Sequence, residues 1–242
     1  MVEFSRLYIR GDWEAREETP QALADRFLRM IDAFAEIDPA LRRWDCEYRR
    51  PKTLESLRGR FAEHVAANME GDFFSGTVYP EFGYRIGAFT RDEPEGRSFS
   101  ISFHAGATTT KNPYFNQVTM GSFGRSELDW SVVNHRIVRS VLLAIAYAWE
   151  PLHVAAYSDE LFAGSRIKAR LREAWIQYLC PRLAEKITPP TAVLAEKLPN
   201  GGLLMSATTE IFDVNNPEHM AAAADIAAAT APLNRLPGPP QR

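Results

Sequence analysis

The stretch GYRIGAFTRDEPEGRSFSISFHAGATTTKNPYFNQVTMG, residues 83–121, decides the fold, because its aromatic and aliphatic residues recur at alternate positions. Such alternation is typical of strands whose two faces meet different surroundings. Segments 91–96 and 111–113 between the alternating runs carry the charged, asparagine, glycine and proline residues typical of turns. The sequence therefore predicts an antiparallel meander with strands over residues 84–89, 99–103 and 115–120.

Helical patterns lie on both sides of this meander. Thr19 and Pro20 provide a hydroxyl cap and a proline at the first helical position, and apolar residues then recur at spacings of three and four up to residue 38. Thr53 caps a second predicted helix, and a longer one is expected over residues 127–149. Because an apolar helical stripe needs a surface to pack against, the sequence predicts an α+β fold in which amphipathic helices cover antiparallel sheet.

The last third of the chain repeats this layout and predicts two similar lobes, about 1–150 and 151–236, within one domain. The Pro-Asn-Gly-Gly segment 199–202 predicts a hairpin, and a final alanine-rich helix is expected over residues 216–231. Residues 167–178 fit a helix as well as a strand. Residues 237–242 are expected to form a flexible tail. Further short strands are expected at residues 4–9, 154–157, 175–180, 193–198 and 203–208.

Composition excludes several classes of protein. The 242 residues are 45% hydrophobic and 24% charged, with a net charge of −3, which is typical of a soluble globular domain and not of a nucleic-acid-binding one. The two cysteines, Cys46 and Cys180, are too few for a disulfide scaffold or a structural zinc site. The sequence starts without an apolar signal core, and its longest apolar run is too short for a bilayer. We therefore expect a cytoplasmic protein that has no cofactor and no membrane partner.

No catalytic motif emerges from the sequence. The Gly-x-Ser-x-Gly elbow, the phosphate-binding loop and the Glu-x-Lys pair of restriction-type nucleases are all absent. The Ser-x-x-Lys match at 165–168 lacks its companion motifs. None of the five histidines lies three or four residues from another, although His104 and His153 could still converge in space. Each histidine is more simply explained as a structural residue with one hydrogen bond.

Loops rich in Asp and Glu suggest a binding function more strongly than any motif suggests catalysis. Recognition residues often lie on loops, and acidic loops could steer a basic partner. The simpler explanation for Glu17 and Glu18 is a solvated helix start. Trp13, three residues before Arg16, fits either a structural clasp or an exposed anchor. The contact residues that we expect from these loops are Trp13, Glu14, Asp92, Glu93, Glu95, Asp159 and Glu160.

The order of short motifs resembles that of the immunity protein 52 family of bacterial polymorphic toxin systems. Each motif is weak alone, but the ordered set spans nearly the whole chain. The matching pieces are LYIRGDWEAREE at 7–18, DP at 38–39, Trp44, GY at 83–84, AWEP at 148–151, Trp175-x-x-Tyr178-Leu179, GGLL at 201–204, FD at 212–213 and NPEH at 216–219.

This resemblance implies an antidote and not a catalyst. Members of the family are expected to bind a co-encoded toxin in the cytoplasm, commonly a nuclease domain of the restriction-endonuclease type delivered by contact-dependent or type VI secretion. The expected partner is then the toxin itself, with no direct contact to nucleic acid, and self-association stays open. Two other functions remain: a small hydrolase assembled around His104 and His153, or a module that binds a small ligand in an apolar cavity.

Overall fold

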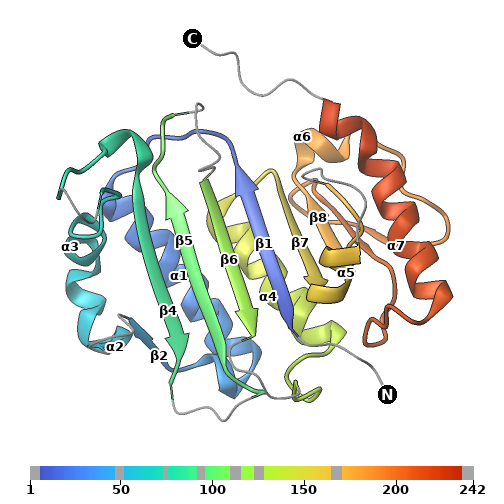
Figure 1. Ribbon diagram of the computed structural model, residues 1–242, viewed down its shortest axis with the longest axis horizontal. Coiled ribbons are helices and arrows are strands. Elements are labelled where there is room, and N and C mark those ends of the chain that lie inside the picture. The colour runs from blue at the N-terminus through green and yellow to red at the C-terminus, as the bar shows by residue number, and fades with distance from the viewer. Residues whose placement is uncertain are drawn as a thin grey trace.

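The computed structural model describes residues 6–46, 52–72, 76–91, 96–109, 116–122, 128–164 and 171–235. Within these ranges ten strands form one sheet in the order β3-β2-β4-β5-β6-β1-β7-β8-β10-β9, and every neighbouring pair is antiparallel (Figure 1). The α+β fold with antiparallel sheet is confirmed. The strands are β1 (Leu7–Trp13), β2 (Trp44–Cys46), β3 (Lys52–Thr53), β4 (Tyr84–Thr90), β5 (Phe99–Ala105), β6 (Asn116–Ser122), β7 (His153–Ser158), β8 (Ile176–Leu179), β9 (Leu194–Lys197) and β10 (Leu203–Ser206).

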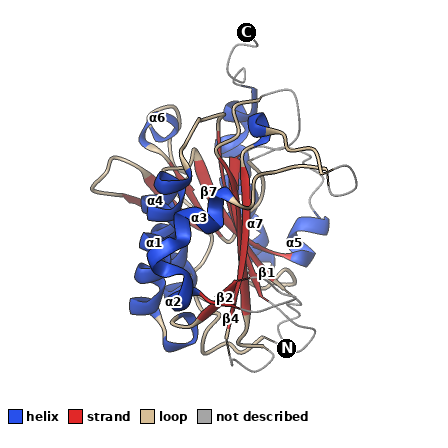
Figure 2. Cartoon of the chain, turned by 90° about the vertical axis from the view of Figure 1, so that its left-hand side faces the viewer, coloured by secondary structure: helices blue, strands red, loops and turns tan. Residues whose placement is uncertain are grey.

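Helices lie on both faces of this sheet but cover them unequally. Figure 2 shows α1, α2, α3 and α4 on one side of the strands, and α5 and α7 on the other. The helices are α1 (Pro20–Ile37), α2 (Leu54–Leu57), α3 (Phe61–Ala66), α4 (His135–Trp149), α5 (Asp159–Gly164), α6 (Pro181–Ala184) and α7 (Pro217–Thr230), with short 3-10 helices η1 (Pro39–Leu41), η2 (Arg58–Arg60), η3 (Pro80–Phe82) and η4 (Ala231–Arg235).

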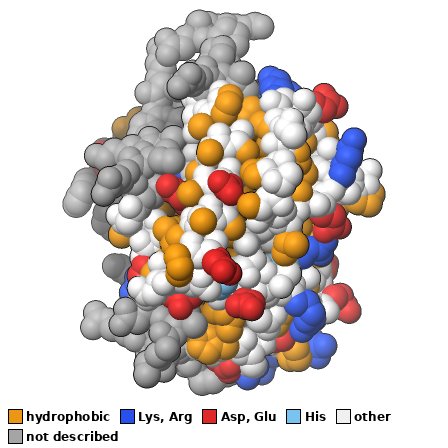
Figure 3. Space-filling model, turned by 90° about the vertical axis from the view of Figure 1, so that its right-hand side faces the viewer, with side chains coloured by type: hydrophobic (Ala, Val, Ile, Leu, Met, Phe, Trp, Pro, Cys, Tyr) orange, Lys and Arg blue, Asp and Glu red, His pale blue; other side chains and the backbone are white. Residues whose placement is uncertain are grey.

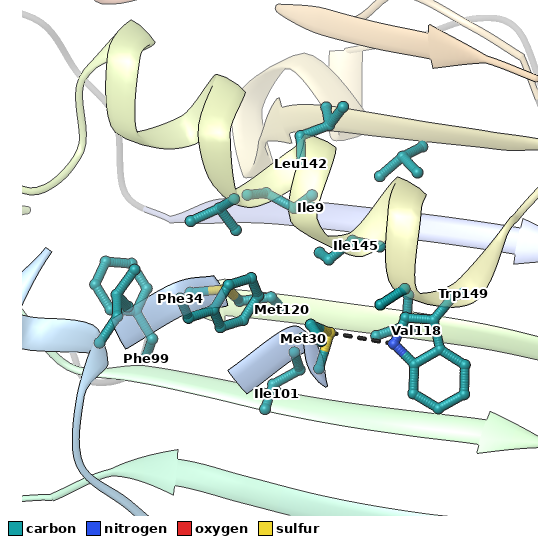
Figure 4. Close-up of a cluster of buried hydrophobic side chains, with 14 of the residues drawn as sticks. Ile9, Met30, Phe34, Phe99, Ile101, Val118, Met120, Leu142, Ile145 and Trp149 are labelled. Carbon is teal, nitrogen blue, oxygen red and sulfur yellow. Dashed lines mark hydrogen bonds between the residues drawn. The ribbon is translucent and has the colours of Figure 1, made fainter. Parts of the chain in front are cut away.

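The main core fills the space between the sheet and the pair α1 and α4. Figure 4 shows Ile9 of β1, Ile101 of β5 and Val118 of β6 beneath Met30 of α1 and Trp149 of α4. The Trp149 indole N–H donates to the Met30 sulfur at 3.1 Å, so even the one polar atom of that ring is satisfied inside the core. Alternation along the strands delivers these side chains to a single face.

Helix ends follow the capping chemistry of the sequence. The Thr19 hydroxyl accepts the Ala22 N–H, and Pro20 begins α1 as predicted. The predicted start of the long helix at 127 was wrong, because α4 begins at His135, where the Asn134 side chain accepts the Ile137 N–H. Residues 128–134 form turns instead. At the other end Glu150 takes the left-handed conformation, with φ of 50°, and Pro151 follows it.

The sheet runs without interruption past residue 150, the expected boundary between two lobes. β1 pairs with β7 over Leu7 to Asp12, so strands from both predicted lobes are neighbours in one sheet. The part beyond β7 has its own small core, in which Ala222 and Ile226 of α7 pack against Leu179 and Met205. β8 occupies Ile176–Leu179, so the ambiguous segment contains a strand. The expected tail at 237–242 lies outside the described residues.

α5 and α7 lie in front of only part of the second sheet face (Figure 1). α7 packs over β8 and β10, whereas no helix of the described residues lies in front of β4, β5, β6 and β1 on the side away from α1 and α4 (Figure 1). We name the outward positions of these four strands the open face. Along β4 the positions of the open face alternate with buried ones, as is usual for an antiparallel sheet with one solvated side. On the other three strands, the open-face positions Asp12, His104 and Gly121 are themselves buried.

Candidate partner-binding surface

Trp13 is the buried end of β1, with 2% of its surface exposed. Its ring stacks on Trp149 with centroids 5.4 Å apart, and the Arg16 guanidinium lies 5.5 Å from the Trp13 centroid. Arg16 also donates to the Trp149 carbonyl oxygen. Of the two roles weighed for this residue, the geometry is that of a structural clasp. Any effect of Trp13 on a partner would therefore act through the loop that it holds.

The same clasp continues through a buried carboxylate. Glu18 has a side chain only 6% exposed and forms ion pairs with Arg16 at 3.0 Å and Arg26 at 2.7 Å. Arg26 in turn reaches the Ala148 carbonyl oxygen and the Glu150 carboxylate. The loop after β1 is thereby fixed to the C-terminal end of α4. Glu18 is thus a structural acid, in keeping with the simpler explanation given for it.

Glu14 follows Trp13 and reaches the surface. Its carboxylate, with the side chain 40% exposed, accepts a hydrogen bond from Arg182 at 2.8 Å. That bond raises the pKa of Arg182, and burial acts in the opposite direction. The Glu14 backbone carbonyl also accepts the Asn116 side-chain amide, which fixes the loop against β6. Glu14 is accessible to a partner, and any partner meets it together with Arg182.

Asp159 and Glu160 begin α5, immediately after β7. Asp159 is 39% exposed and lies 4.0 Å from Arg6, and Glu160 is partly buried. Ser158, the residue before them, pairs with Leu7 at the start of β1, whereas Glu14 follows the end of the same strand. Seven residues of strand separate the two positions, or about 23 Å. Glu14 and Asp159 therefore lie near opposite ends of β1 and do not form one patch. Asp92, Glu93 and Glu95 lie outside the described residues.

A further acidic surface was missed by the reasoning from sequence. Residues 198–234 contain four carboxylates and no Lys or Arg. Figure 3, the side on which α7 lies, shows carboxylates among apolar side chains across its middle, with Lys and Arg toward one margin. The exposed acids here are Glu210, Glu218 and Asp225. The absence of basic residues over such a long stretch was the signal that could have found them.

His104 and His153 do not meet. The registers place His104, Gln117, Asp12 and His153 in one row across β5, β6, β1 and β7. Three strand spacings, about 14 Å, separate the two histidine-bearing strands. The His104 Nε2–H donates to the Phe82 carbonyl oxygen, which ties β5 to η3. A site containing both imidazoles is therefore not formed, because the sheet holds His104 and His153 apart.

In the row that contains His104 and His153, charged side chains gather around Asp12. Arg10 donates from Nε and Nη2 to the Asp12 carboxylate at 2.8–3.1 Å, and His153 Nε2 lies 3.6 Å from the other side of Asp12. Burial by itself lowers the pKa of Arg10, but the ion pair and hydrogen bonds with Asp12 outweigh it and raise the pKa. Burial also raises the pKa of Tyr157, next to Arg10. Arg10 is therefore a permanently charged and rigidly oriented group.

Two further features were compared with the described part of the chain, a metal-binding cluster and a membrane-spanning helix. Those residues contain no group of three or more His, Cys, Asp or Glu side chains placed to hold a metal ion. Among them, no helix combines the length and the apolar character needed to cross a membrane. The arrangement offers ion pairs, aromatic rings and hydrogen-bonding surfaces, which are the means of protein recognition.

Comparison with known proteins gives a structural neighbour and a family. No curated protein matches the chain. Among solved structures, a Pseudomonas aeruginosa protein described as T6SS protein PA0821 aligns with a TM-score of 0.49 and 11% identity, over 92% of this chain and 73% of that one. The family described as immunity protein 52 matches residues 6–233, nearly the whole chain. The match includes β1, the sheet and α7, and the chain belongs to the immunity protein 52 family.

Proposed function

We propose that this protein is an antidote that binds and neutralises a cognate secreted toxin, and that the toxin is a nuclease of the restriction-endonuclease type delivered by type VI secretion. The observation that carries the proposal is the family match over residues 6–233. An immunity protein acts by occupying its toxin, so it needs complementarity of shape and charge and no nucleophile. It acts in the cytoplasm, where an incoming nuclease would meet the chromosome.

The charge of the surface supports a basic partner. A nuclease must present positive charge to phosphates, and carboxylates that face this charge accelerate capture. Glu14, Asp159 and Glu160 are the acidic members of the contact set within the described residues, and Asp92, Glu93 and Glu95 are its members outside them. Because Glu14 and Asp159 lie at opposite ends of β1, they would contact different parts of the toxin. The carboxylates over α7 add a third acidic area.

A non-catalytic mode of action agrees with the arrangement of the histidines. His104 and His153 each have a structural setting, and the strand order keeps them in separate positions. We therefore propose that no reaction is carried out by this chain. Turnover of a substrate by the purified protein, abolished by one substitution, would overturn this part of the proposal.

Co-purification with the toxin domain encoded beside this gene is the direct test. The wild-type protein should retain that domain through size-exclusion chromatography and suppress its nuclease activity. Glu14→Lys and Asp159→Lys should each slow association, with a larger effect at low salt, because rim charges act mainly on the association rate. Glu36→Lys, an exposed position on α1, is the matched control. Failure of the wild-type pair to associate contradicts the proposal.

A further inference from the structure

The open face has a composition unlike that of an ordinary solvated sheet. Its outward positions on β4, β5, β6 and β1 contain neither Lys nor Glu. Long charged side chains at such positions normally keep a sheet soluble and prevent other chains from docking on it. Here the central row across the four strands reads Gly87, Ser102, Thr119 and Arg10. Small hydroxyl residues and glycine beside arginine and tyrosine are the residue types that recognition surfaces favour.

Gly87 lies in the middle of β4 without a structural need for glycine. Its φ angle is not in the positive region, and among the described residues a Cβ built on it would meet only the Ile101 carbonyl oxygen, at 3.9 Å. Glycine inside a strand costs stability, and its presence often marks a place where another molecule approaches the backbone closely. Gly87 and its neighbour Ser102 are both exposed. The fold itself gives no reason for a side chain to be missing here.

Two side chains of β1 on the open face, Arg10 and Tyr8, are fixed by contacts within the protein itself. Arg10 is clamped by the buried Asp12. The Tyr8 ring lies over Gly121, where an added Cβ would come within 3.2 Å of it, and Tyr8 also contacts Tyr157 at a centroid distance of 6.2 Å. Groups fixed in advance lose little conformational entropy on binding, so they contribute more to affinity than mobile ones.

The accessible charge of the open face is positive. Arg85 is exposed and forms no ion pair with any other described residue. Arg10 has a side chain 39% exposed, whereas the carboxylate that accompanies it on this face, Asp12, is 5% exposed. The hydroxyls of Ser102 and Thr119 add hydrogen-bond donors between the two arginines. A segment that carries carboxylates and backbone carbonyls complements this arrangement.

We propose that the open face, centred on Gly87 and Ser102, is the docking surface for a carboxylate-bearing segment of the cognate toxin. This inference rests on the proposed function and adds to it the surface and the charge of the segment that is bound. It is compatible with the acidic contacts, because a metal-dependent nuclease holds its metal with carboxylates inside a basic channel. Acidic loops would then face the channel walls while the open face meets an acidic element.

Binding measurements with single substitutions test the surface. The probe is the toxin domain encoded beside this gene, with its nuclease activity removed, and affinity is measured by titration calorimetry. Gly87→Thr should weaken binding at least about tenfold while the melting temperature stays equal to or above that of the wild type, since threonine favours strands. Ala195→Thr is the matched control on the exposed strand β9, at the far end of the sheet. It should bind like the wild type.

Two substitutions of opposite charge at the same position test whether the bound segment is acidic. Ser102→Glu and Ser102→Lys add similar bulk, so the glutamate variant should bind at least about tenfold more weakly than the lysine variant if the segment is acidic. Equal affinities for the two variants overturn the acidic segment. If the wild type binds and Gly87→Thr binds equally well, the open face is not the docking surface, although the proposed function stands. If the wild type itself does not bind, the proposed function fails.

Discussion

Trp13 stacks on Trp149 with ring centroids 5.4 Å apart, and this contact joins the end of β1 to the end of α4. The motif that follows Trp13 in the sequence completes the joint, since Arg16 reaches the Trp149 carbonyl oxygen and Glu18 binds both Arg16 and Arg26. The glutamates of residues 12–18 therefore do not all have the same role. Glu14 faces solvent, whereas Glu18 is an internal counter-ion.

Arg26→Ala should destabilise the protein by about 2–4 kcal/mol, because it leaves the Glu18 carboxylate buried with Arg16 as its remaining charge partner. Urea unfolding followed by tryptophan fluorescence measures the change. Arg29→Ala removes an exposed arginine from the same helix and should change stability by less than about 0.5 kcal/mol. Equal effects of the two substitutions would show that the clasp does not contribute.

Gly11→Ala should cost about 1–3 kcal/mol, because an added Cβ would lie 3.3 Å from both Val118 and Val154 inside the main core. Gly87→Ala is the matched comparison on the opposite face of the same sheet, where the added atom would have the Ile101 carbonyl oxygen, 3.9 Å away, as its one described neighbour. That substitution should leave the unfolding free energy unchanged or raise it. A loss at Gly87 as large as that at Gly11 would contradict the packing argument and remove the reason for reading Gly87 as a recognition position.

The fold could be predicted from sequence where a local period was strong. Alternation located β4, β5 and β6, and the Thr19 cap located the start of α1. The order of strands could not be predicted, because it depends on contacts between distant segments. β1, first in the chain, lies between β6 and β7, and this position makes one sheet of two predicted lobes. Nothing local in residues 7–13 specifies that placement.

The candidate site was predictable only in part, for a similar reason. Exposure of Glu14 could be expected from its loop, but its pairing with Arg182 joins residues 168 positions apart. The open face is also a product of register, since Gly87, Ser102, Thr119 and Arg10 come from four strands. Apart from Gly87, a glycine inside a strand, each residue is ordinary in its own strand. The row becomes visible only when the strands are aligned.

The Glu14–Arg182 pair should contribute little to folding. Both side chains are about half exposed, and ion pairs in such positions are worth about 0–1 kcal/mol. A double-mutant cycle of Glu14→Ala and Arg182→Ala should therefore give a coupling energy below about 1 kcal/mol, and less in high salt. Coupling of several kcal/mol would instead make Glu14 a structural residue and argue against its role as a contact.

His135 should make the protein less stable under mildly acidic conditions. Burial, and secondarily the charge of Arg139, lowers the pKa of His135 in the folded state, while its Nε2 lies 3.0 Å from the Ser206 hydroxyl. In the unfolded chain the imidazole returns to a pKa of about 6.5, so the unfolded state binds the proton first. Stability is therefore lost as the pH falls below about 6.5 toward the lowered folded-state pKa, and no such loss occurs above it.

His135→Gln keeps a polar group beside Ser206 but cannot titrate, so it separates this proton from the other pH effects. Between pH 7.5 and 5.5 the melting temperature of the wild type should fall by on the order of one or two degrees more than that of the variant. Asp129, whose pKa is lowered by hydrogen bonds from Ser131 and by Arg97, begins to lose its contribution only near pH 4 and below, outside this window. Parallel pH curves for the wild type and the variant would show that His135 takes up its proton equally in both states, and the buried setting at the start of α4 would then have no energetic consequence.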